Sequence, residues 1–182
     1  MASKELLVQY PIALEIIKSW KEQNILYHLE RDEDVFSVLF PPLNIFDEVD
    51  IRELQFNTTF LRQVIEAFPI VMLYYGLLYS DTGIQILNEV RFLIFFVRGI
   101  WGVQGGEGEE GGEEGGENEE KEVDPRLIAP RKEHSRINRM LKFLSILQLT
   151  YQYELLNDFA LQVASDYPDE IAEETVLLWR GE

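Results

Sequence analysis

The chain has no cysteine, which excludes disulfide bonds and thiolate chemistry and is typical of a reducing compartment. It also lacks a continuous apolar run of the roughly 18 residues that would suggest a membrane span, because Arg91 and Arg98 interrupt the best candidate, 84–103. The N-terminal segment carries Glu5 and Glu15 and lacks the basic-then-apolar pattern of a signal peptide. We therefore expect a soluble intracellular protein of the nucleus or cytoplasm, with no membrane partner.

Positive charge is scarce. Lysine and arginine together number 16 against 33 aspartates and glutamates, which gives a net charge of -17. Phosphate contacts supply most of the affinity of proteins for nucleic acid, so an acidic chain is a poor general nucleic-acid binder. Another protein, or a second copy of this chain in a homodimer, is the expected partner.

Residues suited to catalysis or metal binding are also few. The two histidines, His28 and His134, match no zinc-site spacing, and we expect both at the surface. Carboxylate pairs such as Asp32 and Asp34 lack an apolar setting that would separate their pKa values, and no serine lies in a nucleophile elbow. We predict a non-enzyme with no catalytic residue, no bound metal and no cofactor.

Residues 105–122 consist almost wholly of glycine and glutamate and contain no hydrophobic residue. Nine glutamates and one lysine give this stretch a charge of -8. Glycine costs backbone entropy and like charges repel, so such a stretch cannot form a core, and its carboxylates would repel phosphate. We predict a disordered acidic insertion in one domain formed by 1–104 and 123–182.

The stretch 60–79 is the most apolar long segment and begins with helical spacing. Asn57 or Thr58 can cap its start, and Gly76 can end it in a left-handed conformation. Pro69 lacks an N–H and predicts a kink or a restart within it. We expect a central helix buried on nearly all sides.

Helical spacing recurs through the rest of the chain. Residues 4–29 predict one or two helices, with Pro11 in a first turn and apolar residues spaced four apart at Ile12, Ile16 and Trp20. The segment 84–87 fits a short strand or a helix start, while 91–101, 135–149, 151–164 and 169–179 fit helices.

With 46% hydrophobic residues, the chain can bury a sizeable core. We predict an all-α fold: a single compact multi-helix domain of about six to eight helices. Its core is expected to centre on Val64, Phe68, Met72, Phe95, Leu141 and Leu144.

Two features indicate partner binding. The basic segment 126–142 holds six cations and one acid, and its helix face is either a solvated face paired with the acidic insertion or a docking face for an acidic partner or nucleic acid. The aromatic helix 91–101 is either a contact surface for a second chain or is buried on all sides. The expected contact residues are Phe92, Phe96, Trp101, Arg131, Lys132, Arg136, Arg139 and Lys142.

Several stretches resemble the N-terminal region of the opioid growth factor receptor family. They are the acidic–aromatic run 34–41 that ends in Leu-Phe-Pro, the helix 61–77 that ends in Tyr-Gly, the turn 80–83, and the helix 134–149 with its Arg-Ile-x-Arg-x-Leu-Lys-x-Leu pattern. Val38 replaces the tryptophan usual before Leu-Phe-Pro, and Pro69 interrupts the middle helix. The resemblance implies an α-helical, nuclear or perinuclear interaction domain, and no matched residue carries peptide-hormone binding.

These observations favour a non-enzymatic helical protein-interaction module that acts as a scaffold or adaptor in an intracellular complex. A nucleic-acid-associated factor using the basic 126–142 face is the alternative. A further alternative is a Bcl-2-like helical groove protein, because the stretch 98–102 resembles the Gly-x-x-Trp-Gly turn of that family.

Overall fold

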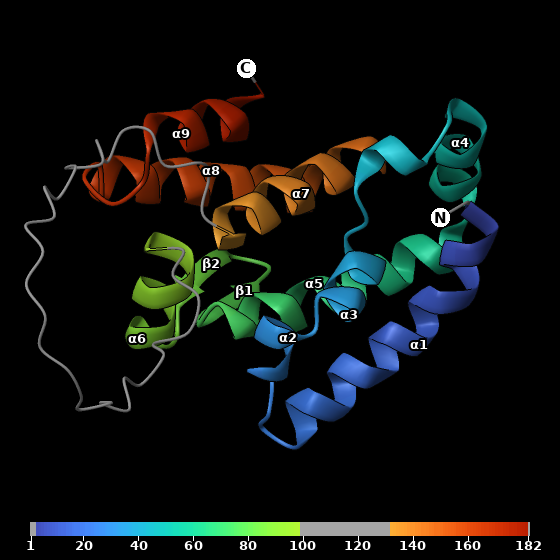
Figure 1. Ribbon diagram of the computed structural model, residues 1–182, viewed down its shortest axis with the longest axis horizontal. Coiled ribbons are helices and arrows are strands. Elements are labelled where there is room, and N and C mark those ends of the chain that lie inside the picture. Colours follow the sequence, from blue (N-terminus) through green and yellow to red (C-terminus); the bar gives the residue numbers. More distant parts are fainter. Residues whose placement is uncertain (1–2, 99–131, 182) are drawn as a thin grey trace, which may run out of the picture.

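The computed structural model describes residues 3–98 and 132–181 (Figure 1). The first segment begins with α1 (Ser3–Glu22), α2 (His28–Arg31), α3 (Glu33–Leu39), the 3-10 turn η1 (Leu43–Ile45), α4 (Glu48–Phe56) and α5 (Thr58–Tyr74). It continues through β1 (Leu77–Ser80), β2 (Gly83–Ile86), α6 (Glu89–Arg91) and the π-helical segment η2 (Phe92–Val97). The second segment comprises α7 (Lys132–Ile146), α8 (Thr150–Asp166) and α9 (Glu173–Arg180).

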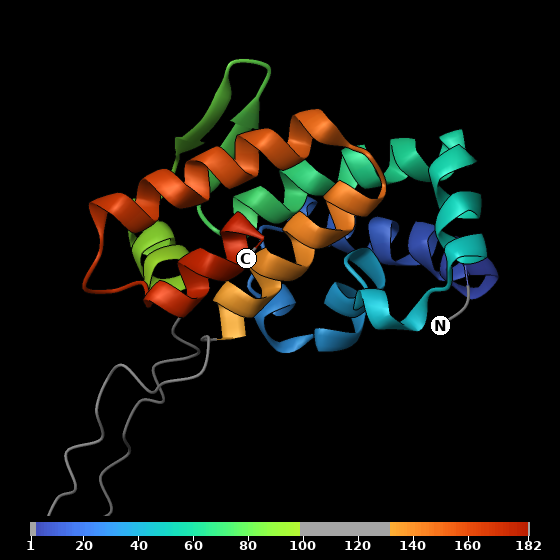
Figure 2. The same cartoon turned by 90° about the horizontal axis from the view of Figure 1, so that it is seen from above.

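The helices pack in layers on both sides of α5. In Figure 1, α7, α8 and α9 lie above α5 and α1 lies below it, and Figure 2 shows α7 and α8 from above. Helix α1 packs against α3 and α5, while α7, α8 and α9 pack against one another. A single buried apolar cluster runs from Leu6 on α1 to Trp179 on α9, so both described segments share one core.

The predicted all-α character is confirmed for the described residues, which add only one two-stranded antiparallel hairpin. In this hairpin Leu77 pairs with Ile86 and Ser80 with Gly83. Residues 77–79, the end of the apolar stretch 60–79, therefore form a strand and not the last turn of the helix. In Figure 2 the hairpin projects beyond α8, and Tyr151 on α8 donates a hydrogen bond to the Asp81 carbonyl at 2.9 Å.

The predicted ends of α5 are confirmed. The Asn57 side chain caps its start by accepting a hydrogen bond from the backbone N–H of Phe60 at 3.0 Å. Gly76 follows the helix with φ +77°, the left-handed conformation that favours glycine. The backbone oxygen of Gly76 then accepts hydrogen bonds from the N–H groups of Leu87 and Asn88, so this glycine also joins the hairpin to α6.

The structure contradicts the placement of Pro11 in a first turn and the restart at Pro69; the alternative of a kink at Pro69 stays a prediction. Helix α5 continues through Pro69 without a restart, and Pro11 lies in the interior of α1 rather than in its first turn. A proline in a helix removes one hydrogen bond and crowds the preceding turn, at a cost of about 3 kcal/mol. Burial of the apolar faces of both helices against the core offsets that local cost.

The predicted core residues are buried with one exception. Val64, Phe68 and Met72 on α5 and Leu141 and Leu144 on α7 are at most 2% exposed. Phe95 is only partly buried; its ring stacks on Tyr74 with centroids 5.0 Å apart. Among the described residues, no helix combines the length and the apolar character needed to cross a bilayer. The predicted insertion 105–122 lies outside the described residues.

Candidate protein-interaction surface

Helix α1 carries apolar side chains on two faces. One face is buried in the core through Leu6, Tyr10, Ala13, Leu14 and Ile17. The other face carries Val8, Ile12, Ile16 and Trp20, each four residues after the last, and we call these four residues the α1 stripe. Val8 is 67% exposed and Ile12 59% exposed, while Ile16 and Trp20 are partly buried. Residues four apart lie on one face of a helix, so the stripe is continuous.

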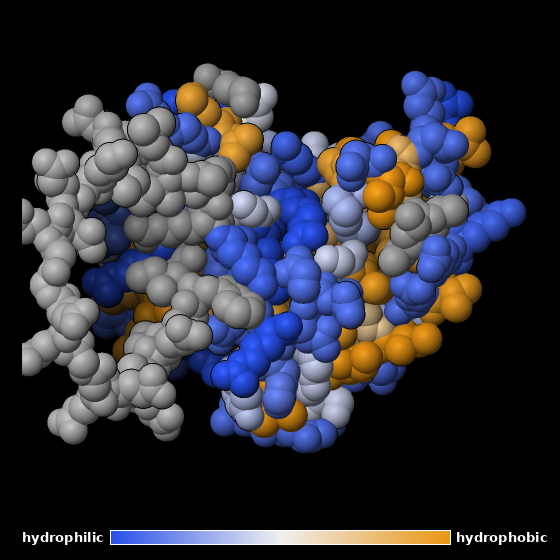
Figure 3. Space-filling model, in the orientation of Figure 1, coloured by the Kyte–Doolittle hydropathy of each residue, from blue (hydrophilic) through white to orange (hydrophobic). Residues whose placement is uncertain are grey.

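Hollows flank the α1 stripe on both sides. The first lies between α1 and α3, and Ile12 and Ile16 form one wall while Asp34, Val35 and Val38 form the other. The second runs along α1 and shares Ile12 and Ile16, with Glu15 and Trp20 at its edge. Figure 3 shows a band of apolar surface in orange over the lower right of the molecule, where Figure 1 places α1.

A third hollow adjoins the stripe at Trp20. It is lined by Trp20, His28 and Arg31 together with three consecutive carboxylates, Asp32, Glu33 and Asp34, which we call the acidic end. The ring centroids of Trp20 and His28 are 5.7 Å apart, and Tyr27 stacks on His28 at 4.6 Å. An apolar stripe therefore meets an aromatic and acidic hollow at one end.

Local sequence signals set where α3 begins and ends. Asp32 caps its start, and its side chain accepts a hydrogen bond from the backbone N–H of Val35 at 2.9 Å. The helix ends at Leu39, before Phe40 and two prolines that cannot continue it. Phe36 is buried, and the exposed Asp34 lies at the rim of the groove.

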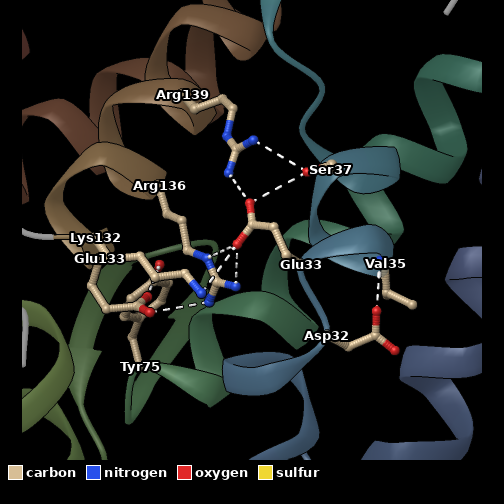
Figure 4. Close-up of polar contacts among 9 residues, drawn as sticks. All are labelled: Asp32, Glu33, Val35, Ser37, Tyr75, Lys132, Glu133, Arg136 and Arg139. Atoms are coloured by element: carbon tan, nitrogen blue, oxygen red, sulfur yellow. Dashed lines mark hydrogen bonds and ion pairs between the residues drawn. The ribbon is translucent and has the colours of Figure 1, made fainter. Parts of the chain in front are cut away.

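An ion cluster fastens α3 to α7, and Figure 4 shows Glu33 between the cations of α7. One oxygen of Glu33, Oε2, lies 2.8 Å from Arg136 Nη2 and 3.4 Å from Lys132 Nζ. The other, Oε1, lies 2.6 Å from Arg139 Nη2. The guanidinium carbons of Arg136 and Arg139 lie 4.5 and 5.0 Å from the centre of the Phe36 ring. We call Glu33, Lys132, Arg136 and Arg139 the Glu33 cluster.

The inner side of the Glu33 cluster is fully buried. Arg136, 1% exposed, also donates to Glu133 at 3.1 Å, and Glu133 is 0% exposed. The hydroxyl of Tyr75 donates to the other oxygen of Glu133 at 3.0 Å. A buried charge is tolerated only when it is paired and hydrogen-bonded, and Glu133 meets both conditions.

The environment shifts the pKa values of both glutamates, in opposite directions. Partial burial alone would raise the pKa of Glu33, but the hydrogen bonds and positive charges of Arg139 and Arg136 lower it to about 2. Burial raises the pKa of Glu133 despite the charge of Arg136 beside it. Burial and the neighbouring Glu133 likewise raise the pKa of the Tyr75 hydroxyl. The two carboxylates therefore respond differently to acid.

The structure corrects the expectation for the aromatic helix. Phe92 and Phe96 are at most 1% exposed, because α6 and η2 turn them towards α8 and α9. The ring of Phe96 meets Phe159 at 5.4 Å and Trp179 at 6.2 Å. Neither residue can contact a partner in this conformation, and Trp101 lies outside the described residues.

The structure also corrects the basic docking face at one position. Arg136 is buried and paired within the chain, so it does not belong to a docking surface. Lys132 and Arg139 are partly exposed and contact Glu33, whereas Lys142 is exposed. Arg131 lies outside the described residues. Glu33 within the domain therefore already pairs with three of the cations that were expected to face an acidic partner or nucleic acid, namely Lys132, Arg136 and Arg139.

One histidine departs from the surface position expected for both. His134 is 2% exposed, its Nε2 lies 3.0 Å from the backbone oxygens of both Phe96 and Val97, and its ring meets Trp179 edge-on at 5.6 Å. This histidine links α7 to η2. Within the two described segments, no group of three or more histidine, aspartate or glutamate side chains is placed to hold a metal ion.

Other exposed apolar residues lie near the hairpin and on α4. Leu78, Ile86, Leu87 and Val90 near the hairpin are 41% to 66% exposed, and Val49 and Phe56, which line a hollow on α4, are 73% and 83% exposed. The α1 stripe differs from both groups because it lies beside a groove whose far wall is a second helix, α3. The spacing of Ile12, Ile16 and Trp20 indicates a helix face but not a docking surface, because α1 is apolar on two faces and spacing alone does not show which face is buried.

In comparisons with known proteins, no family model, no curated protein and no solved structure matches this chain. The resemblance to the opioid growth factor receptor family stays a prediction. The stretch that resembles Bcl-2-like proteins lies outside the described residues from position 99 onwards.

Proposed function

We propose that this chain is a non-enzymatic helical protein-interaction module that serves as a scaffold or adaptor, and that the α1 stripe is its docking surface. The observation that carries the proposal is the exposure of Val8 and Ile12 on a helix whose opposite face already fills the core. A helix that is apolar on both faces has more apolar surface than its own domain buries.

Burying this surface would stabilise a complex. Complete burial of a valine or isoleucine side chain contributes about 1.5–3 kcal/mol relative to exposure. Trp20 adds an aromatic side chain at the edge of a hollow, and tryptophan is among the residues that most often dominate binding energy. The stripe therefore offers apolar surface that a partner can bury and an aromatic side chain, Trp20, that can dominate the binding energy.

The wall of the groove is held in place before any partner binds. Glu33 at the start of α3 is fastened to α7 by Arg136 and Arg139, and Asp32 caps the same helix. A preformed surface loses less conformational freedom on binding, which favours affinity. An intracellular complex, in the cytoplasm or nucleus, is consistent with a chain without cysteine.

The test is site-specific photo-crosslinking of the full chain in cells that express it. A photoreactive amino acid at position 12 should give a discrete crosslinked species, whereas the same group at position 90 should not. Ile12 and Val90 are similarly exposed, at 59% and 66%, so non-specific hydrophobic contacts would give crosslinks from both positions. Equal labelling from both positions, or none from position 12, would contradict the proposal.

A further inference from the structure

We infer that the α1 stripe receives a basic amphipathic helix of a partner protein, a helix with apolar side chains on one face and lysine or arginine beside them. This inference rests on the proposed docking function of the stripe. It adds the chemistry of the occupant, which the ionisable groups around the stripe indicate.

Carboxylates dominate the ionisable groups at the stripe. Among the described residues, the hollow along α1 has Glu15 as its one charged lining residue, and the groove beside α3 has Asp34. Glu15 is 71% exposed and Asp34 is exposed. At the adjoining hollow, Asp32 and Asp34 of the acidic end lie near Arg31 and His28, while Glu33 is already paired with the cations of α7. Charges of one sign beside an apolar surface select a partner of the opposite sign.

Several cations nearby are paired within the chain, although Lys4, one helical turn before Val8, and Arg31 are exposed. Lys18 contacts Glu15 at 2.9 Å, but it also bridges to Glu66 on α5 at 2.8 Å, on the side away from α3. Arg136 and Arg139 are used in holding Glu33. Asp34 has no ion-pair partner within the described segments. An incoming cation would therefore find Asp34 available and Trp20 beside it, whose ring face can also attract a cation.

The dimensions suit a helix. Val8 and Trp20 are twelve positions apart, so at 1.5 Å per residue the stripe is about 18 Å long. Apolar side chains four apart on a facing helix of about three to four turns would match this length. A helix laid on an apolar groove is a common mode of peptide recognition.

Charge argues against the two occupants that this protein itself could supply, a second copy of the chain and the acidic stretch 105–122. A second copy would bring another net charge of -17 and would set Glu15 and Asp34 against their own equivalents. The acidic stretch 105–122, with its charge of -8, has the same sign as the rim of the groove. A basic helix from a different protein satisfies both the apolar surface and the charge.

The experiment is a selection from a displayed library of amphipathic helices of about 14 residues, a length that covers the stripe. The apolar positions are constant, and each polar position encodes lysine, glutamate, glutamine or serine. Selection on the full chain should enrich lysine next to the apolar face. Enriched peptides should bind less tightly at high salt, because exposed charge pairs are screened.

Matched variants locate the binding site and its charge dependence. Ile12→Gln should weaken the selected peptides by about tenfold or more, and Leu87→Gln, at a position of nearly equal exposure, should leave affinity within about twofold. The double variant Glu15→Gln and Asp34→Asn should weaken lysine-rich peptides and reduce their salt dependence, with little effect on glutamine-rich ones.

Enrichment of acidic or uncharged peptides would overturn the inference, as would binding that Ile12→Gln leaves intact or self-association of the purified chain through position 12. These results are separable from failure of the proposed function. If crosslinking at position 12 captures a discrete partner while the library yields no basic preference, only the inference about charge falls. If position 12 captures nothing, the docking function falls as well.

Discussion

Nη2 of Arg136 lies 2.8 Å from Oε2 of Glu33, although 103 residues separate the two in sequence. The contact joins the first turn of α3 to the first turns of α7, on the two sides of residues 99–131. Because the Glu33 cluster also positions the wall of the groove beside the α1 stripe, its integrity bears on both folding and binding.

Removal of the Arg136 guanidinium should be strongly destabilising. Arg136→Met would leave Glu133, which is 0% exposed, with Tyr75 as its remaining hydrogen-bond partner. Breaking a buried pair from one side costs about 3–5 kcal/mol. Urea unfolding would measure the loss. The double variant Glu133→Gln and Arg136→Met should recover part of it, because no buried charge is then left unpaired. A loss below about 1 kcal/mol in the single variant would contradict the prediction.

Acid should weaken the contribution of Glu33 to stability. Its pKa falls from the ordinary value of 4.5 to about 2 in the folded chain, so the charged form is stabilised by folding. That contribution is present above pH 4.5 and is lost as the pH falls from about 4.5 towards 2. The side chain is 42% exposed, so solvent and salt screen the effect.

A comparison with Glu33→Gln isolates this titration. Glu133, whose pKa is raised by burial, acts in the opposite direction but is present in both proteins. The stability advantage of the wild-type chain over Glu33→Gln should therefore be constant near neutral pH and shrink in acid. Chemical denaturation at a series of pH values would measure it. An advantage that does not change between pH 6 and pH 3 would refute the assignment.

The inward face of α7 should be sensitive to truncation. Leu144 is 0% exposed, so Leu144→Ala should cost about 2–5 kcal/mol by removing buried apolar groups and leaving a cavity. Lys142→Ala is the control on the same helix, because Lys142 is exposed, and it should change the free energy of unfolding by less than about 0.5 kcal/mol. Similar losses in the two variants would mean that the helix is not oriented as described.

Gly76 should not tolerate a side chain. Its φ is +77°, and an added Cβ would lie 2.5 Å from the backbone oxygen of Asn88 and 2.9 Å from Cβ of Arg91. Gly181 has nearly the same φ, +79°, but nothing lies within 4 Å of its Cβ position. Gly181→Ala should therefore cost about 1–2 kcal/mol at most, from backbone strain alone. Gly76→Ala should lower the melting temperature clearly further, and equal effects would exclude the clash.

Local signals in the sequence determined where several helices begin and end. Asn57 caps α5, Gly76 follows it in the left-handed conformation, and Pro41 comes after the end of α3. These signals act over four or five residues through single hydrogen bonds or steric exclusion, so neighbouring sequence is enough to read them. The amphipathic pattern of α7 likewise indicated that Leu141 and Leu144 face inward.

Other features of the fold depend on residues distant in sequence. The sequence did not show that Arg136 would turn inward to Glu33, because both belong to charged stretches that can equally face solvent. The burial of Phe92 and Phe96 depends on α8 and α9, which lie after residues 99–131. Helices α1 and α5 both continue through a proline, because core packing outweighs the local cost.

The α1 stripe likewise depends partly on local sequence and partly on the tertiary structure. The sequence by itself predicted helix within 4–29, with Ile12, Ile16 and Trp20 on one face, since residues four apart share a face when the period is 3.6 residues. Only the tertiary structure decided that Leu6, Tyr10 and Leu14 are buried while Val8 and Ile12 are exposed. The physical reason is that α3 and α5 can cover one face of a helix and not the other.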